Sequence, residues 1–556
     1  MKSEQSGTAN YDAIVVGAGF GGIRALHELR GLGLTVRVIE AGTDVGGTWY
    51  YNRYPGARTD SEAWLYAYSF SKDIQDNWDW SERYPGQPEA LAYLQYVADV
   101  CDMRKDIQFS TRVSAATYDE PSTCWRVTTD DGKTLTASYL ISATGPLSTP
   151  YKPDFPGFEN FRGEWYLTGN WPKEPVSFAG KRVAVIGTGA TAVQAIPLIA
   201  LTASQVTVFQ RTPNYVLPAR NAPLTNFDRE AYRSNYDKIW ARTKTQFFGF
   251  DFDDAGRRLV DVPIEESQRV LERYWEIGSF RILFETFDDI FTNERTNEVV
   301  SDFIREKIRS IVKKPQTAEL LCPKDHPLGS KRPPLGHFYY EAFNRDNVQL
   351  ISVRDNPISE ITATGIRCGD SQFDVDVIVF ATGFDAVTGT LNRLNITGRD
   401  GSTLRETWRD GPQTYLGIGV AGFPNFFMVG GPQSPFANIP VIIDGCVEWI
   451  GRAIKFLRDN EASAMEPSAE SVRAWCAHMN ALVEQTVLPR ASGSWFMGGN
   501  IPGKPRVVLF HFGGAGVYRE ECNAVADDNF TGFDIAYGPT QSYVPADVKQ
   551  KLSEPM

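Results

Sequence analysis

The chain has 556 residues, of which 42% are hydrophobic and 22% charged, as in ordinary globular proteins, and its length allows roughly three to four domains. A net charge of −12 without any basic stretch argues against nucleic acid as a partner. Because no apolar run could span a bilayer and residues 1–10 are polar, we expect a cytoplasmic protein with no membrane partner.

The cysteines and histidines are too scattered to predict a metal site or a redox-active disulfide. The seven cysteines form no CxxC or CxxxxC pair, which excludes the dithiol of a disulfide reductase. The five histidines are His27, His326, His337, His478 and His511. His337 lies near Arg332 in the sequence and is a candidate for the active site, although a packed or solvated side chain is the more ordinary interpretation.

The N-terminal region predicts a dinucleotide-binding unit. Its parts are a strand at Tyr11–Val16, a turn at Gly17–Gly22, a helix at Gly22–Arg30 and a strand at Thr35–Ile39. In such a turn Gly17 allows the tight bend, Gly19 the approach of a pyrophosphate and Gly22 the packing of helix on strand. Glu40, about 20 residues on, can accept hydrogen bonds from ribose hydroxyls.

A second unit of the same kind follows. Its parts are a strand at Lys181–Ile186, a turn at Gly187–Ala192, a helix at Val193–Ile199 and a strand at Val206–Gln210. Ala192 replaces the third glycine, which is an accepted variant. No acid ends the second strand; Arg211 stands there instead, which favours the 2′-phosphate of NADPH. Two such units predict two dinucleotide sites in one chain.

The order of these units predicts an α/β fold with two Rossmann-like dinucleotide-binding domains and a helical insertion. Helical runs such as Ile264–Ile277 and Thr296–Lys313 mark the insertion, and Ala-Thr-Gly strands at Tyr139–Gly145 and Val375–Gly383 mark passages between domains. We expect the first dinucleotide-binding domain at 1–145 and 381–556, where the tail is weakly patterned, and the second at 181–224 and 318–380. A linker is expected at 146–180 and the helical insertion at 225–317.

The most specific signal is the segment Gly46–Asp60. It fills every fixed position of the pattern [AG]-G-x-W-x4-[FY]-P-[GM]-x3-D, and the chain thereby resembles the Baeyer–Villiger monooxygenases. The resemblance extends from about Tyr11 to Val507. It implies tightly bound FAD at the first turn, NADPH at the second, and conversion of a ketone and O2 to an ester or lactone through a flavin C4a-peroxide and a tetrahedral adduct.

The resemblance also implies the site residues. Those expected at FAD are Gly17, Gly19, Phe20, Gly22, Glu40, Gly47, Thr48, Trp49, Asp60 and Tyr66. Those expected at NADP are Arg58, Thr59, Gly187, Thr188, Gly189, Ala190, Thr191, Ala192, Arg211, Thr212, Lys331, Arg332 and Trp495. For Trp495 the alternative of simple core packing stays open.

Lys331 and Arg332 precede Tyr339-Tyr340-Glu341 and Phe343–Val348, as in the family, where the pair supplies a 2′-phosphate ligand and the catalytic arginine. The chemistry agrees with this role. Negative charge moves through the oxygenation, and a permanently protonated guanidinium can stabilise it. Asp60 is expected to orient Arg332 and balance its charge.

The chain departs from the family at one diagnostic position. The stretch Phe161–Pro172 keeps the family's Phe, Gly, Trp and Pro, but Leu167 stands where the family has His. In the family this His lies in the linker and couples NADPH binding to domain movement. We therefore expect the change to affect the coupling of NADPH to oxygenation and to leave the fold and reaction class intact.

The loop Gly430–Pro440 matches the family loop that borders flavin and substrate, with Gln433, Ser434 and Phe436 as expected substrate-loop residues. Its compact form resembles that of cyclohexanone monooxygenases, which favours cyclic aliphatic ketones. We expect a monomer or a small homo-oligomer. The alternatives are an N- or S-oxygenating flavin monooxygenase, which lacks the Trp49–Asp60 fingerprint, and a non-catalytic NADPH-binding sensor.

Overall fold

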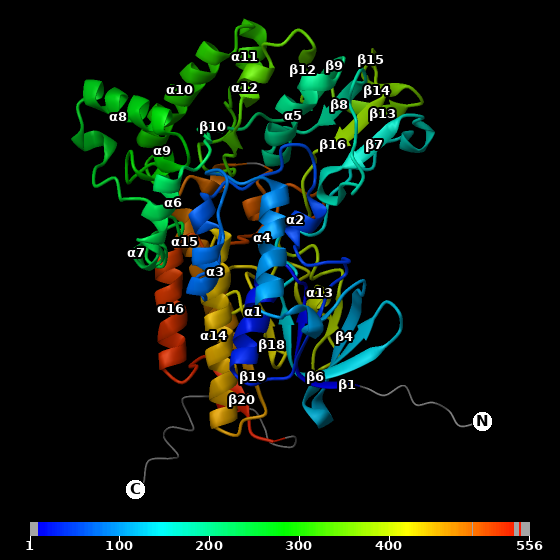
Figure 1. The fold of residues 1–556 in the computed structure, drawn as a ribbon, viewed down its shortest axis with the longest axis vertical. Helices are drawn as coiled ribbons and strands as arrows, with labels where there is room; N and C mark the ends of the chain where they lie inside the picture. Colours follow the sequence, from blue (N-terminus) through cyan, green and yellow to red (C-terminus); the bar gives the residue numbers. More distant parts are fainter. Residues whose placement is uncertain (1–8, 492, 539–543, 546–556) are drawn as a thin grey trace.

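The computed structural model describes residues 9–491, 493–538 and 544–545. Within these residues two large sheets, each flanked by helices, form the lower and upper parts of the molecule (Figure 1). A group of helices extends from the upper part on the side away from the second sheet. This architecture confirms the predicted α/β class with two Rossmann-like units and a helical insertion.

The first sheet holds the N-terminal unit toward one end of its strand order. In spatial order its strands are β17 (Asn395–Thr397), β4 (Val113–Asp119), β5 (Cys124–Thr129), β6 (Thr134–Ser142), β1 (Ala9–Val16), β2 (Val36–Ile39) and β3 (Ile107–Gln108), and β18 (Phe426–Met428) pairs with β6. Strand β1 runs parallel to both β2 and β6, so Gly17 follows the carboxyl end of a central strand. Helix α1 (Phe20–Gly31) begins directly after this turn, two residues earlier than predicted.

The second sheet is parallel throughout. Its strands in spatial order are β12 (Val348–Ser352), β9 (Gln205–Gln210), β8 (Arg182–Ile186), β16 (Val377–Phe380) and β7 (Glu164–Leu167). Helix α5 (Ala190–Thr202) connects β8 to β9. Strand β7 comes from the segment expected as a linker, and it pairs with β16 at the edge of the sheet. The linker therefore contributes one strand to the NADP-type unit.

The insertion is helical, as predicted. Its helices are α6 (Asn226–Arg233), α7 (Tyr236–Thr243), α8 (Ile264–Ile277), α9 (Arg281–Phe284), α10 (Glu294–Ile311) and α11 (Pro315–Leu321). Helix α8 has the predicted limits. Helix α10 begins two residues before the predicted Thr296, because the side chain of Asn293 accepts hydrogen bonds from the first backbone N–H groups.

The tail beyond Gly514 is more regular than its weak pattern indicated. It forms α16 (Ala515–Asp527) and β20 (Phe533–Ala536). Helix α16 packs beside α14 (Ile439–Asp459), and α15 (Ala469–Glu484) lies nearby in Figure 1. Strand β20 pairs with β19 (Ala464–Pro467) and with β21 (Val544–Pro545).

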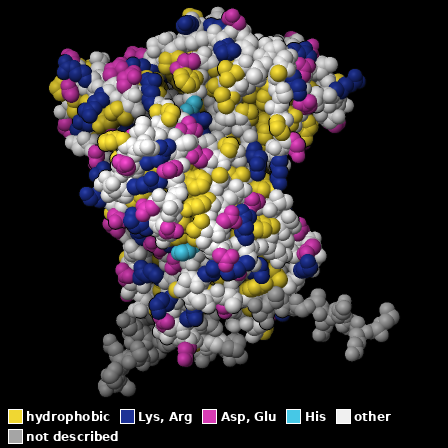
Figure 2. All heavy atoms as spheres, in the orientation of Figure 1, with side chains coloured by type: hydrophobic (Ala, Val, Ile, Leu, Met, Phe, Trp, Pro, Cys, Tyr) yellow, Lys and Arg dark blue, Asp and Glu magenta, His cyan; other side chains and the backbone are white. Residues whose placement is uncertain are grey.

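The remaining helices and strands lie outside these two sheets and the insertion. The helices are α2 (Thr48–Tyr51), α3 (Lys72–Asn77), α4 (Gln87–Val100), α12 (Tyr339–Ala342) and α13 (Leu404–Thr407); the strands are β10 (Leu217–Pro218), β11 (Leu335–Gly336), β13 (Ile358–Thr362), β14 (Gly365–Cys368) and β15 (Ser371–Asp374). Among the described residues no helix is both long and apolar enough to cross a membrane. Acidic and basic side chains are interspersed over the face shown in Figure 2.

Candidate active site

The first glycine turn leaves a backbone cradle that side chains would fill. Gly17 has φ +104°, and a Cβ there would lie 2.7 Å from the carbonyl oxygen of Ala143. A Cβ on Gly22 would collide with the carbonyl oxygen of Gly17, and one on Gly47 would lie 2.8 Å from Cα of Gly19. No side chain caps the N-terminus of α1, so its backbone N–H groups are available to an anion. These features fit a dinucleotide pyrophosphate.

Glu40 is buried at the end of β2, and its carboxylate holds the turn. One oxygen accepts a hydrogen bond from the backbone N–H of Ala18 at 2.7 Å, and the other accepts one from Gly42 at 2.6 Å. Each oxygen has a second lone pair, so the carboxylate can also meet ribose hydroxyls. Part of the role of Glu40 is thus to support the loop, which the sequence spacing did not indicate.

The fingerprint segment packs against this turn. Helix α2 carries Thr48 and Trp49, and the ring of Trp49 is buried with its edge toward Tyr66, 5.6 Å between centroids. Phe20 contacts Tyr66 in the same manner at 5.0 Å. Three of the residues expected at FAD, namely Phe20, Trp49 and Tyr66, therefore lie together beside the first turn.

The second turn repeats the cradle. Gly187 has φ +112°, and a Cβ there would collide with the carbonyl oxygen of Ala381. Gly189 precedes α5 as its N-cap, Ala190 and Thr191 form the first helical positions, and Ala192 is fully buried. The Thr188 hydroxyl donates to the carbonyl oxygen of Thr212 at 3.0 Å, which ties this turn to the segment after β9.

Arg211 and Lys331 lie close enough for their charges to interact. Burial, followed by the positive charge of Arg211, lowers the pKa of Lys331. Two cations held near each other are stabilised when an anion binds between them, and the 2′-phosphate of NADPH has this chemistry. The two side chains therefore fit the predicted phosphate site, although they are more than 100 residues apart in the sequence.

Asp60 and Arg332 form the predicted ion pair, with 2.5 Å between Oδ2 of Asp60 and Nη2 of Arg332. The Asp60 side chain is 6% exposed and that of Arg332 is 29% exposed, so the arginine keeps a face open while the acid is enclosed. The backbone carbonyl of Arg332 accepts a hydrogen bond from Asn214 at 2.8 Å. Its guanidinium carbon lies 6.0 Å from the ring centroid of Phe280.

Gln194 on α5 is a site residue that sequence reasoning missed. Its amide donates to the carbonyl oxygen of Arg58 at 3.2 Å and to Oδ1 of Asp60 at 3.4 Å, and its oxygen accepts from the Tyr54 hydroxyl at 2.8 Å. Gln194 thus joins the NADP-type helix to the fingerprint. No motif marks it, because a glutamine within an apolar helix carries no recognisable spacing.

Two other residues expected at NADP have protein partners. The Arg58 guanidinium lies 3.5 Å from the Glu82 carboxylate, and it also reaches the carbonyl oxygen of Tyr84. Thr59 is buried, and its hydroxyl donates to the carbonyl oxygen of Ser61 at 2.9 Å. Both residues position the loop that carries Asp60.

In the loop expected to border the substrate, two side chains turn inward. Gln433 is buried, accepts from the Thr414 hydroxyl at 2.8 Å and reaches Cys476 and the carbonyl of Pro412. The Ser434 hydroxyl donates to the carbonyl oxygen of Gly431 at 2.6 Å. These two side chains hold the loop in place through hydrogen bonds to other protein groups.

Phe436 points into an aromatic cluster instead. Its ring lies 5.8 Å from that of Trp495, 4.5 Å from Phe496, 5.5 Å from Phe510 and 6.4 Å from Phe512. Trp495 is partly exposed within this cluster, so packing accounts for part of its surface. The loop is also tied to the fingerprint, because the Ser61 hydroxyl donates to the Asn438 side chain.

Leu167 is the last residue of β7 and pairs with Phe380 of β16. Its side chain packs against the core between this sheet and the hairpins around Ile366. Just beyond it, the backbone N–H of Trp171 donates to the carbonyl oxygen of Tyr51 in the fingerprint at 3.1 Å. The segment therefore runs from the edge of the NADP-type sheet to the flavin-type unit.

The histidines are less dispersed in space than in sequence. His337 packs edge-on against Tyr84, 6.3 Å between centroids, and burial lowers its pKa to about 3. His326 is 6% exposed, and burial together with the nearby charge of Lys331 lowers its pKa to about 4. His478 and His511 meet at Glu521, so the expectation of a fully scattered set is wrong for this pair.

Two glycine cradles at the carboxyl ends of parallel strands define a two-dinucleotide oxidoreductase. The chain also matches the family model described as pyridine nucleotide-disulphide oxidoreductase over residues 11–271. All seven cysteines lie among the described residues and are free, so the match reflects the nucleotide-binding architecture and involves no dithiol.

Relatives along the whole chain are more specific. A phenazine N-monooxygenase from Lysobacter antibioticus is 44% identical over 534 residues, which cover 96% of this chain and 98% of that protein. A Baeyer–Villiger monooxygenase from Pseudooceanicola batsensis is 43% identical over 526 residues, which cover 94% and 96%.

Solved structures agree. Cyclohexanone monooxygenase from Rhodococcus sp. Phi1 bound to NADP+ superposes with a TM-score of 0.93 at 41% identity, over 96% of this chain and all of that one. OTEMO in complex with FAD and NADP superposes with a TM-score of 0.91 at 42% identity, over 95% of this chain and 99% of that one. The chain belongs to the Baeyer–Villiger monooxygenases, and it is an FAD-dependent enzyme with NADP as its second cofactor.

Proposed function

We propose that the enzyme inserts one oxygen atom of O2 beside the carbonyl group of a ketone, with NADPH as the reductant, and releases an ester or lactone. The observation that carries the proposal is the Asp60–Arg332 ion pair, which joins the last fixed position of the fingerprint to the expected catalytic arginine. Retention of this pair also argues against a non-catalytic NADPH sensor.

The residues around the first cradle would hold FAD tightly, and those around the second would hold NADPH. When bound, FAD supplies the redox chemistry that links NADPH to O2. The nucleotide phosphates would meet the backbone N–H groups of α1 and α5, and Arg211 and Lys331 would take the 2′-phosphate. Thr212 would support this site through its bond to Thr188.

Arg332 would stabilise the negative charge that develops on the carbonyl oxygen of the ketone. A guanidinium keeps its proton at any working pH, so it can offer charge and hydrogen bonds without transferring a proton. Asp60, enclosed and held by Gln194, fixes the direction of the guanidinium. Preorganised donors of this kind contribute roughly a hundredfold to a thousandfold in rate.

The substrate class that we favour is cyclic aliphatic ketones. Aromatic side chains lie beside both expected parts of the substrate site: Phe280 is next to the Arg332 guanidinium, and Phe436 of the loop clusters with Trp495 and Phe510. Such surfaces suit an apolar ring with one polar group. Support also comes from relatives named cyclohexanone 1,2-monooxygenase, from Acinetobacter sp, and cyclopentanone 1,2-monooxygenase, from Comamonas sp..

Oxygenation of nitrogen is a second candidate function, because the phenazine N-monooxygenase is 44% identical to this chain. A nucleophilic ring nitrogen would take oxygen without any need for charge stabilisation on a carbonyl. The importance of Arg332 therefore separates the two functions. A monomeric or small oligomeric state and residence in the cytoplasm stay predictions.

The test is to incubate the purified holoenzyme with NADPH, O2 and a panel of cyclic ketones, linear ketones and phenazines. Mass spectrometry then detects products heavier by one oxygen atom, and chromatography against standards separates lactones from N-oxides. A lactone supports the proposal. NADPH consumption with N-oxides alone would replace it with the second candidate, and protein purified without flavin would return the sensor interpretation.

A further inference from the structure

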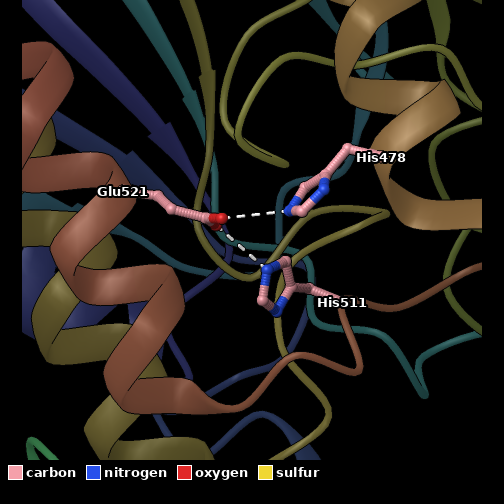
Figure 3. Close-up of side chains that lie close together, drawn as sticks. All are labelled: His478, His511 and Glu521. Carbon is pink, nitrogen blue, oxygen red and sulfur yellow. Dashed lines mark hydrogen bonds and ion pairs between the residues drawn. The ribbon is translucent and has the colours of Figure 1, made fainter. Parts of the chain in front are cut away.

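His478, His511 and Glu521 come from three separate segments and meet at one point (Figure 3). His478 lies on α15, Glu521 on α16 and His511 on the extended segment between them. Nε2 of His478 is 3.0 Å from one carboxylate oxygen of Glu521, and Nε2 of His511 is 3.0 Å from the other. Two imidazoles and a carboxylate so arranged could form either a metal site or a hydrogen-bonded network.

The orientation of His511 decides between them. The backbone N–H of Gly513 donates to Nδ1 of His511 at 3.2 Å, so Nδ1 carries no proton. In the neutral ring the proton is then on Nε2, which donates it to Glu521. A metal ion would need the lone pair of Nε2 and a proton on Nδ1, which would face the Gly513 N–H. The network is therefore hydrogen-bonded.

His511 is held firmly in this network. Its side chain is fully buried, Trp475 stacks on the ring at 5.6 Å with 20° between planes, and Tyr518 meets it edge-on at 5.5 Å. Burial alone would raise the pKa of Glu521, but the two histidines, His511 foremost, more than offset this effect and lower it. Glu521 thus accepts the Nε2–H as a carboxylate.

The backbone around His511 runs alongside the loop Gly430–Pro440. The N–H of Gln433 donates to the carbonyl oxygen of Leu509 at 2.8 Å, and the N–H of His511 donates to that of Ser434 at 3.0 Å. His511 and Pro435 form a parallel bridge. The side chain of His511 contacts Trp475, Tyr518 and Glu521, whereas the residues on either side of it contact Phe436, so successive side chains alternate in direction.

This alternation places Phe510 and Phe512 on the face opposite to His511. Both contact Phe436, and Phe510 lies 5.3 Å from Trp495. In the sequence, His511 therefore lies between two residues whose rings belong to the aromatic cluster proposed above to border the ketone. A shift of one residue in this segment would exchange the two faces.

We propose that Glu521, acting through His511, is a positioning residue for the ketone pocket: it fixes the register of residues 509–512 against the loop Gly430–Pro440. The inference rests on the proposed function for the identity of the ligand. His478 contributes less, because its side chain is 40% exposed and water can replace its hydrogen bond.

The test compares Glu521→Leu with Glu521→Gln in the FAD-loaded enzyme. Leucine cannot accept the buried Nε2–H, so KM for cyclohexanone should rise about tenfold while KM for NADPH stays within twofold. Glutamine offers an amide oxygen at the same place and should restore KM for cyclohexanone to within twofold of wild type. The matched control is His478→Ala, which leaves the His511–Glu521 bond in place and should behave as wild type.

Calorimetric binding of cyclohexanone to the oxidised enzyme with NADP+ supplies a readout that needs no turnover. If the wild type binds cyclohexanone but forms no lactone, the proposed function fails. The positioning role is then tested by comparing the affinity of the wild type and of the Glu521 variants for cyclohexanone. Where Glu521→Leu does not fold, Glu521→Asp, which withdraws the carboxylate by one methylene group, takes its place.

Three results would overturn the proposal: an unchanged cyclohexanone KM and affinity in Glu521→Leu, an equal rise in KM for NADPH, or a Gln variant as impaired as the Leu variant. Titration with Zn²⁺ alone addresses the metal interpretation. Stoichiometric Zn²⁺ binding that disappears in His478→Ala would show that the cluster is a metal site and would likewise overturn the assignment.

Discussion

Lys331 is a half-buried amine, and its pKa is lowered first by burial and then by the positive charge of Arg211. In the proposed holoenzyme the 2′-phosphate of NADPH relieves this repulsion. Lys331→Ala should therefore weaken NADP+ binding roughly tenfold to a hundredfold, the range for one charge-assisted hydrogen bond, and leave NAD+ binding unchanged.

Fluorescence titration of the holoenzyme with NADP+ and NAD+ measures the difference. Lys331→Arg serves as the control, because it retains the positive charge and should keep most of the discrimination between the nucleotides. Equal losses of affinity for both nucleotides in Lys331→Ala would contradict the phosphate role.

Some site residues could be predicted from the sequence and others could not. Asp60 and Arg332 were predicted as a pair because both occupy positions of long motifs, and the structure joins them. Gln194 and Glu521 carry no motif. Their roles depend on contacts made across more than one element of the fold, which a single sequence does not display.

At the scale of elements, β7 connects the edge of the second sheet to the flavin-type unit. Leu167 ends this strand and is partly buried against the core. A histidine at this position would fill similar space and would add a hydrogen-bonding group that leucine lacks. We expect Leu167→His to raise the ester formed per NADPH consumed, while the melting temperature changes little because β7 lies at the sheet edge.

Parallel assays of ester, NADPH and H2O2 give the coupling ratio for this variant. Leu167→Asn is a matched control that introduces polarity without an imidazole. No change in coupling in Leu167→His would remove this position from any role in NADPH use.

Elements with strong periodicity were predicted well. Helix α8 has its predicted limits, and both glycine-turn units appear where their apolar strands and turns indicated. The elements at the end of the chain were not predicted. Helix α16 carries charged residues between its buried ones, so its pattern becomes clear only once α14 is known to pack beside it.

For the whole molecule, buried neutral histidines predict sensitivity to acid. The pKa of His326 falls to about 4 in the folded protein, against an ordinary value of 6.5. Below pH 6.5 the unfolded chain binds this proton and the folded chain does not. The free energy of unfolding therefore decreases as the pH is lowered from 6.5 to about 4. Between pH 7 and pH 5 the loss from His326 is about 2 kcal/mol.

Urea unfolding at both pH values measures this loss. His326→Phe keeps a ring beside Tyr215 and removes the titrating group, so the difference between the two pH values should shrink by about the same amount. His337, whose pKa falls to about 3, remains as a second contributor in both proteins. An unchanged difference in His326→Phe would contradict the assignment.

The overall architecture was predictable because each copy of the strand–turn–helix–strand unit fixes parallel strands in one of the two sheets, with a ligand site at the carboxyl ends of those strands. The contribution of β7 to the second sheet was not, because a four-residue strand inside a proline-rich stretch resembles a linker. The division of the chain into domains stays a prediction.

The central claim is that Arg332 enables insertion of oxygen beside a ketone carbonyl. The most direct measurement supplies wild type and Arg332→Ala with NADPH, cyclohexanone and ¹⁸O2, and follows the lactone by mass spectrometry. Wild type should form lactone carrying one ¹⁸O atom, whereas Arg332→Ala should consume NADPH and form less than about one hundredth as much lactone. Labelled lactone from Arg332→Ala at the wild-type rate would contradict the account.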